Sequence, residues 1–252
     1  VHRFWLLADI AQGERLPVPV GELDTTLEPQ SSPEGKQGSM ANTQLQIASC
    51  SADLDGDQRD EAIWAMPRAA GGCGISIVSL SDDDPPVVMP HGATLPLTQP
   101  CQVPALVSFD LNSDGAQDLL LSSVRMDEAG RELAHSLWVL WNDGRGNFAA
   151  ERMSRVDEDG DSPLAFTALP AVVVPNEGTI APSIVYVTER GLQRKVWVEG
   201  AQRFESDSHV PALVLTAGHA LTSGDFNGDG AVDLALADGN KLMVFLAELG
   251  LP

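Results

Sequence analysis

The feature that most constrains this chain is a nine-residue loop with side-chain oxygens at alternate positions and an apolar run directly after it. In residues 225–233 (DFNGDGAVD), positions 1, 3, 5 and 9 are Asp225, Asn227, Asp229 and Asp233. Gly230 at position 6 supplies a backbone that can turn freely. Calcium binds six to eight oxygens at about 2.3–2.6 Å, and alternate positions on a curled loop supply them. We therefore predict a calcium site here, to which Ala231 at position 7 adds its backbone carbonyl.

The same pattern occurs twice more, earlier in the chain. In residues 110–118 (DLNSDGAQD) the predicted ligands are Asp110, Asn112, Asp114, the carbonyl of Ala116, and Asp118. In residues 53–61 (DLDGDQRDE) they are Asp53, Asp55, Asp57, the carbonyl of Arg59, and Glu61. Gln58 replaces the glycine at position 6 of this loop, and either Asp60 or Glu61 closes it. We expect two to three calcium ions in these loops. Their role is expected to be structural, because four side chains and a carbonyl nearly saturate each ion.

The spacing of the loops predicts a repeat. Asp53 and Asp110 are 57 residues apart (110 − 53), and Asp110 and Asp225 are 115 apart (225 − 110), close to twice that. A fourth repeat is therefore expected between them, and residues 173–178 (VVPNEG) lie at that place. This segment keeps a Glu-Gly pair but lacks the outer acids, so we interpret it as a repeat whose metal site has decayed. Repeats of this length are typical of propellers and arrays.

Short apolar runs follow one plan in each repeat: a strand before the loop, a second strand directly after it, and a third after a turn. The first strands are expected at 45–48, 105–109, 168–174 and 220–223, the second at 61–65, 118–122, 183–187 and 233–237, and the third at 75–80, 136–141, 195–199 and 241–246. Two repeats continue through a glycine turn to Phe148 and Phe204. No helical period stands out, and the weak alternation is typical of strands buried on both faces.

These patterns predict an all-β chain that forms a β-propeller of four-stranded blades. Residues 4–10 and those from 15 onward are expected to be strands that end a preceding or closing blade (1–27), followed by a polar linker (28–40). The blades are expected at 41–100, 101–160, 161–212 and 213–252, the third with the degenerate loop and the last incomplete. Tryptophans are expected to pack between blades, with stacking on sugars as the alternative: Trp64, Trp138, Trp141 and Trp197.

The run from Asp225 to Leu234, taken with the glycine turn at residues 142–148 (NDGRGNF), resembles the FG-GAP/VCBS repeat family. Repeats of that family build the propellers of integrin α-subunits and of many bacterial secreted proteins. The resemblance implies a ring of about seven blades with calcium between strands on one rim. Only about four blades and a partial one are counted here. The ring is therefore expected to be completed by another chain, or the chain is a fragment, or the propeller is unusually small.

Charge and cysteines bear on partners and location. The chain has 15 Lys and Arg against 36 Asp and Glu, a net charge of −21, which argues against nucleic acid and anionic membranes as partners. No apolar run approaches the roughly 20 residues that span a bilayer. Three cysteines allow one pair, such as Cys73 with Cys101, and one thiol, Cys50. Calcium and a disulfide favour an extracellular, cell-surface or periplasmic location. The chain begins at Val1 without a signal peptide, so a processed or excised piece is expected.

No catalytic constellation is recognised. The histidines lack the paired spacing of metal ligands: His2, His91, His135, His209 and His219. The favoured function is a non-enzymatic protein-binding, adhesion or scaffold module, and the alternative is a carbohydrate-binding or polysaccharide-lyase domain. A lyase would need a base and a cation that neutralises a uronate, and Arg125, Arg190 and Lys195 form no visible cluster in the sequence. The acidic run at 157–161 is interpreted as a surface loop with, at most, a weak ion site.

Overall fold

The structure is a computed structural model, and it describes part of the chain. The described residues are 2–6, 18–23, 48–67, 73–80, 88–94, 101–126, 132–157, 171–174, 182–188, 191–206, 219–238 and 241–246. The chain divides into two compact units, each described by itself. The first unit comprises Val1–Leu45 with Leu80–Val88, and the second comprises Gln46–Ser79 with Met89–Pro252.

In the first unit the residues that the structure describes form one antiparallel pair of strands. β1 (His2–Leu6) pairs with β2 (Val18–Leu23), and the register shifts between Phe4 and Trp5. Strands were predicted at 4–10 and from 15 onward. The observed pair agrees in number, but each strand is displaced by two or three residues at its start. The predicted linker at 28–40 lies outside the described residues.

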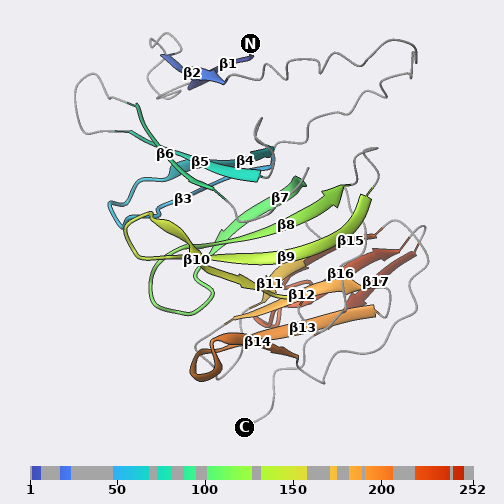
Figure 1. Cartoon of the computed structure of the whole chain (residues 1–252). Helices are drawn as coiled ribbons and strands as arrows, with labels where there is room; N and C mark the ends of the chain where they lie inside the picture. The colour runs from blue at the N-terminus through green and yellow to red at the C-terminus, as the bar shows by residue number, and fades with distance from the viewer. Residues whose placement is uncertain are drawn as a thin grey trace, which may run out of the picture. The chain divides into compact units, whose positions relative to one another are not determined.

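In the second unit the described residues form four antiparallel sheets, each built from consecutive strands (Figure 1). The first sheet consists of β3 (Ala48–Ala52), β4 (Glu61–Pro67), β5 (Cys73–Leu80) and β6 (Val88–Thr94). The second consists of β7 (Cys101–Phe109), β8 (Asp118–Met126), β9 (Glu132–Asn142) and β10 (Phe148–Arg155). The third consists of β11 (Ala171–Val174), β12 (Ser183–Thr188), β13 (Gly191–Val198) and β14 (Arg203–Ser206). The fourth consists of β15 (His219–Gly224), β16 (Asp233–Asp238) and β17 (Lys241–Phe245).

The prediction of an all-β chain is confirmed, whereas several strand boundaries were wrong. β6 was not predicted, and β3 starts three residues after the expected position. β13 begins at Gly191, which pairs with Thr188 at the end of β12. It ends at Val198, where a 3₁₀ turn, η2 (Glu199–Ala201), begins. The described strands do not close into a ring.

The described side chains of this unit form three apolar clusters between successive sheets. The first joins the first and second sheets through residues such as Ile63, Ile75 and Leu121. The second joins the second and third sheets, and the third joins the third and fourth. The two middle sheets therefore contribute side chains to a cluster on each face. This explains the weak alternation, because all six residues of β12 are buried.

The tryptophans of the third strands pack as predicted. Trp141 is 7 % exposed and belongs to the second cluster, against which Trp197 packs from the next sheet. Their ring centroids are 4.4 Å apart. Trp138 packs against the first cluster, as does Phe148 at the end of its glycine turn. Trp64 on β4 is half-buried and is not part of the three described clusters.

Equivalent first strands of neighbouring sheets lie together. β3 contacts β7, and β11 contacts β15. The Ser108 hydroxyl donates to the Ser51 carbonyl at 3.4 Å, and these serines are 57 residues apart, the same interval that separates Asp53 from Asp110. Residues one repeat apart are therefore neighbours in space.

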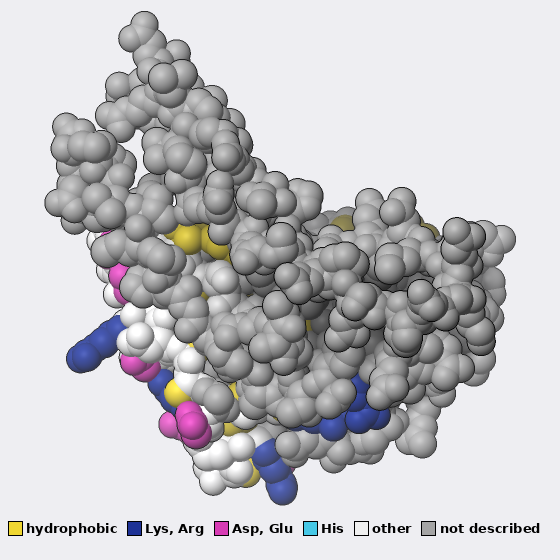
Figure 2. Space-filling model, turned by 45° about the horizontal axis from the view of Figure 1, so that its top comes forward, with side chains coloured by type: hydrophobic (Ala, Val, Ile, Leu, Met, Phe, Trp, Pro, Cys, Tyr) yellow, Lys and Arg dark blue, Asp and Glu magenta, His cyan; other side chains and the backbone are white. Residues whose placement is uncertain are grey.

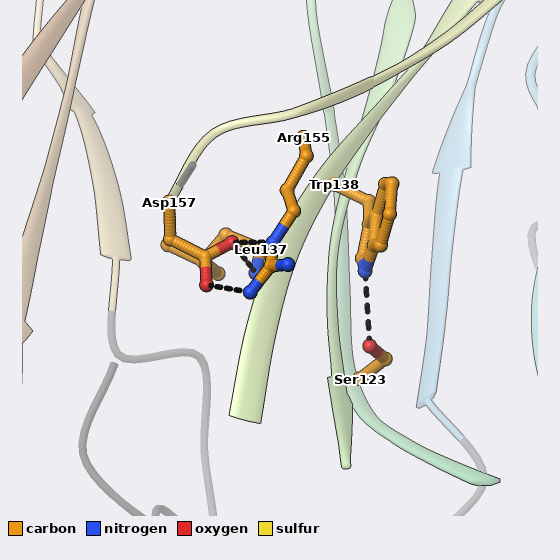
Figure 3. Close-up of polar contacts among 5 residues, drawn as sticks. All are labelled: Ser123, Leu137, Trp138, Arg155 and Asp157. Atoms are coloured by element: carbon orange, nitrogen blue, oxygen red, sulfur yellow. Dashed lines mark hydrogen bonds and ion pairs between the residues drawn. The ribbon is translucent and has the colours of Figure 1, made fainter. Parts of the chain in front are cut away.

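A buried carboxylate closes the end of β10 (Figure 3). Asp157 is 1 % exposed, accepts from the backbone N–H of Leu137 at 3.1 Å, and pairs with the Arg155 guanidinium at 2.9 and 3.1 Å. The same guanidinium lies over the Trp138 ring, 5.8 Å from its centroid. Asp157 was predicted to begin an exposed acidic loop, and this was wrong for Asp157 because its oxygens anchor the strand. Residues 158–161 lie outside the described residues.

Of the three cysteines, the side chains of Cys50 and Cys73 are described. Cys73 is disulfide-bonded, whereas Cys50 is a free cysteine. Burial raises the pKa of the Cys50 thiol to about 11. The side chain of Cys101, the predicted partner of Cys73, lies outside the described residues.

The described surface is mixed in charge. Figure 2 shows one face of the molecule, on which the described acidic and basic side chains lie near one another with hydrophobic atoms between them. Among the described residues, no helix has the length and apolar character needed to cross a bilayer.

Candidate metal centre

The three acidic loops share one backbone ladder, in which side-chain oxygens accept N–H groups of their own loop. We number the loops 1 (53–61), 2 (110–118) and 3 (225–233). The acid at position 1 accepts the N–H of position 6 in each case: Gln58 to Asp53 at 2.9 Å, Gly115 to Asp110 at 3.0 Å, and Gly230 to Asp225 at 2.9 Å. The oxygen at position 3 accepts from position 5, at 3.1, 3.0 and 2.9 Å in loops 1, 2 and 3. Each loop is thus curled around its first three side-chain oxygens.

The inner end of each loop is tied back to its start. The carboxylate at position 5 accepts the N–H of position 7, at 2.8, 2.9 and 2.8 Å. The carboxylate at position 9 accepts the N–H of position 2: Leu54 to Glu61 at 2.8 Å, Leu111 to Asp118 at 3.1 Å, and Phe226 to Asp233 at 2.9 Å. Nine residues therefore adopt one conformation three times, although the sequences differ at most of the other positions.

Glu61, and not Asp60, closes loop 1. Glu61 is 3 % exposed and takes the bond from Leu54 that the equivalent aspartates take in the other loops. Asp60 is exposed and accepts from the Ser51 hydroxyl at 3.1 Å. The sequence did not decide which of the two residues closes the loop, because either carboxylate is long enough to reach it. In the structure, the pairing of Ala52 with Glu61 determines that Glu61 points inward.

Two residues in each loop have left-handed backbone. Position 6 has φ of 69° at Gln58, 89° at Gly115 and 90° at Gly230, and position 4 has φ of 81° at Gly56, 61° at Ser113 and 78° at Gly228. Position 6 was predicted from the sequence but position 4 was missed, although glycine occupies it in loops 1 and 3. Loops 1 and 2 thus each hold one non-glycine residue in a conformation that disfavours it.

Replacing Gln58 with glycine is expected to stabilise the chain. The strain of a left-handed glutamine costs about 1–2 kcal/mol, and the added freedom of glycine in the unfolded chain offsets about 0.4–1 kcal/mol of that. The net rise in the free energy of unfolding should be about 0.5–1 kcal/mol, measured by urea denaturation. Gln117→Gly is the matched control, because Gln117 is not left-handed and its replacement should destabilise. A Gln58→Gly variant no more stable than the parent would contradict the assignment of strain.

The carboxylates at position 9 are buried beside other acids. Asp118 and Asp233 are 0 % and 1 % exposed. Burial raises the pKa of Asp118 to about 7, with smaller contributions from the charges of Asp114 and Asp110, while two backbone N–H groups oppose the rise. Burial likewise raises the pKa of Glu61, and the nearby Asp55, Asp57 and Asp53 add to it. The charged form of Glu61 in loop 1 and of Asp118 in loop 2 is therefore costly, and a cation among these oxygens would lower that cost.

Three acids of loop 1 lie close together. Ligand atoms of Asp53, Asp55 and Glu61 all lie within 4.8 Å of one another. Among the described residues no second group of three acids, histidines or cysteines is gathered in this way. In loops 2 and 3 the residue equivalent to Asp55 is an asparagine, Asn112 or Asn227, which supplies an amide oxygen instead. The donor sets consist of carboxylate and carbonyl oxygens, with an amide oxygen in loops 2 and 3, and such oxygens suit a hard cation such as calcium.

Asn142 joins loop 1 to loop 2. Its side-chain amide is 0 % exposed and donates to the Leu54 carbonyl at 2.7 Å and to the Gln117 carbonyl at 3.1 Å. Its side-chain oxygen accepts the N–H groups of Gly144 and Gly146, both at 3.1 Å. Its backbone N–H donates to Asp118 at 2.9 Å. One side chain thus uses all its hydrogen-bonding capacity to fix the glycine turn between two loops from different sheets, a role that the sequence did not reveal.

The remaining predicted sites are only partly described. Residues 175–178 of the degenerate loop, Arg190 and His209 lie outside the described residues, as do the side chains of the other histidines except His135. His135 is half-buried on β9. Arg125 is exposed, whereas Lys195 is 2 % exposed and donates to the Ser206 hydroxyl at 2.8 Å. Arg125 and Lys195 thus lie in different sheets and in different environments.

The fold and the loops define a class of protein: antiparallel sheets repeated along the chain, with an acidic loop between the first and second strands of three of them. Comparison of the sequence with known proteins adds nothing to this class. No protein-family model matches the chain, and no curated protein matches it.

Proposed function

We propose that this chain is a calcium-stabilised β-propeller module of the FG-GAP/VCBS type that acts outside the cytoplasm as a protein-binding, adhesion or scaffold domain. The observation that carries the proposal is the hydrogen-bond ladder common to loops 1, 2 and 3. Calcium would be held by the side chains at positions 1, 3, 5 and 9 and the carbonyl at position 7. It would supply the positive charge that the clustered carboxylates lack.

The arrangement of the sheets supports the propeller. Four successive antiparallel sheets bury clusters between them, and first strands of neighbouring sheets lie together, as strands near a common axis would. A single four-stranded sheet cannot bury both of its faces, so each blade depends on its neighbours. In this account the loops are the connections that calcium makes rigid, and the surface they form is available to a protein partner or another subunit.

A structural calcium predicts a specific response to loss of one ligand. Asp114→Ala and Asp229→Ala should each melt at a lower temperature in calcium than the parent, and each should lose one site's share of calcium stabilisation. That share is about 2.7 kcal/mol when calcium is at 100 times its Kd. Asp60→Ala is the control, since Asp60 is an exposed loop acid outside the ligand positions. If both loop variants melt like the parent with and without chelator, the structural role is wrong.

A further inference from the structure

A cavity of about 510 Å³ lies between the second and third sheets. This volume is within the range of small-molecule sites, about 300–1,000 Å³. Residues from four segments line it: loop 2, the end of β9, the second half of β10, and the end of β13 with η2 and the residue after it. Those that carry the argument are Asn112, Asp114, Glu151, Arg152, Trp197 and Glu199.

The apolar wall of the cavity is rigid. Trp141 and Trp197 both line it, and each contacts Phe204, at centroid distances of 6.0 and 5.0 Å. The indole N–H of Trp141 donates to the Ser154 hydroxyl at 2.8 Å, which fixes that ring in place. Trp197 is half-buried, so it combines core packing with a surface that a ligand can reach. An aromatic surface held in this way suits the C–H face of a ring-shaped ligand.

The polar wall combines donors and acceptors. Glu151, Arg152 and Glu199 are exposed, and with the loop 2 side chains they surround the opening with carboxylate, guanidinium and amide groups. A hydroxyl both donates and accepts, so a polyhydroxyl ligand can bond to all of these groups at once. The lining carries three carboxylates, Asp114, Glu151 and Glu199, and one guanidinium, Arg152. The carboxylates disfavour an anionic ligand. A neutral ligand rich in hydroxyls can bond to the carboxylates and to the guanidinium, and a cationic ligand is the competing occupant that the test below includes.

We propose that this cavity binds a neutral saccharide, and that calcium in loop 2 fixes one of its walls. Asn112 and Asp114 are positions 3 and 5 of loop 2 and also line the cavity. The side-chain amide of Asn112 donates a hydrogen bond to the Asp114 carboxylate at 2.9 Å. A cation that orders these two side chains orders the sugar site. The calcium dependence rests on the proposed function, whereas the cavity itself does not.

The test is saccharide binding to the full chain, with and without calcium. Cellobiose, lactose and methyl β-glucoside are titrated by calorimetry and by tryptophan fluorescence, and glucuronate and arginine methyl ester serve as charged probes. At least one neutral sugar should bind in calcium, and chelation should weaken it about tenfold or more, the equivalent of 1.4 kcal/mol. Glu151→Ala and Glu199→Ala should each weaken it by about the same factor. Both residues are exposed, so the fold should survive.

Two controls separate this site from the rest of the molecule. Glu205→Ala removes an exposed acid of the third sheet that is not among the cavity residues, and Asp229→Ala disables loop 3 without touching loop 2. Neither should change sugar affinity. The saccharide proposal is overturned if calcium binds and stabilises the chain while no neutral sugar binds, or if arginine methyl ester binds instead. Sugar binding that persists unchanged in chelator overturns the link to calcium in loop 2. Sugar binding that Glu205→Ala weakens as much as Glu199→Ala overturns the location of the site in this cavity.

Discussion

Replacing Asn142 with alanine is expected to lower the free energy of unfolding by about 3 kcal/mol or more. The side chain makes four hydrogen bonds at a fully buried position. Its removal leaves two carbonyls and two N–H groups without that partner, and each buried unsatisfied group costs about 1–3 kcal/mol. Water can enter near the glycine turn and recover part of the loss, so the sum of the four is an upper limit.

The measurement is urea unfolding of the variant beside a matched control. Asn147→Ala alters the same turn, but Asn147 is exposed, and its side chain donates to Asp143, where it lowers the pKa of that carboxyl. This control should cost less than about 1 kcal/mol, as is usual for surface positions. Asn142→Asp keeps the acceptor oxygen but loses both donated bonds, so it should also be strongly destabilised. Equal stability of the Asn142 and Asn147 variants would show that the two loops are not joined in this way.

Removing calcium is expected to lower the melting temperature by roughly 5–10 °C for each occupied loop. Calcium at 100 times its Kd adds about 2.7 kcal/mol per site, and 1 kcal/mol corresponds to about 2–4 °C in a chain of this size. The physical cause is the buried acid at position 9 of each loop. In loops 1 and 2 this acid lies beside other carboxylates, and Arg59 of loop 1 is the one basic residue in the three loop sequences.

Calorimetric scans in calcium and in chelator measure this effect, with magnesium at equal concentration as the control. Magnesium demands near-ideal octahedral geometry and gives up its water reluctantly, so it should stabilise less. Identical scans in all three conditions would contradict the role of the loops. A gain from magnesium as large as that from calcium would point to general screening of acidic repulsion.

The strand content and the acidic loops could be predicted from the sequence because both depend on local patterns. An acidic loop followed by an apolar run predicts the turn and the strand after it, and the second strands at 61, 118, 183 and 233 begin where expected. β6 was missed because Pro90 and Gly92 within it are unfavourable to strands. Glu199 was assigned to a strand because nothing local marks the 3₁₀ turn that starts there.

What the sequence could not reveal depends on contacts between distant segments. Asn142 was recognised as the first residue of a turn, but its bond to Leu54 spans 88 residues. The cavity beside loop 2 combines residues from 112 to 202, and no spacing in the sequence brings them together. Position 4 of the loops, by contrast, had a local signal: Gly56 and Gly228 occupy it, and aligning the three loops by eye would have marked it.

The most direct test of the central claim is a calcium titration of the whole chain by isothermal calorimetry. We predict two to three sites, with one lost in Asp114→Ala and a different one lost in Asp229→Ala. The Gln58→Gly variant should bind calcium in loop 1 more tightly than the parent. Absence of calcium binding, or a stoichiometry that neither aspartate variant changes, would contradict the account of these loops as metal sites.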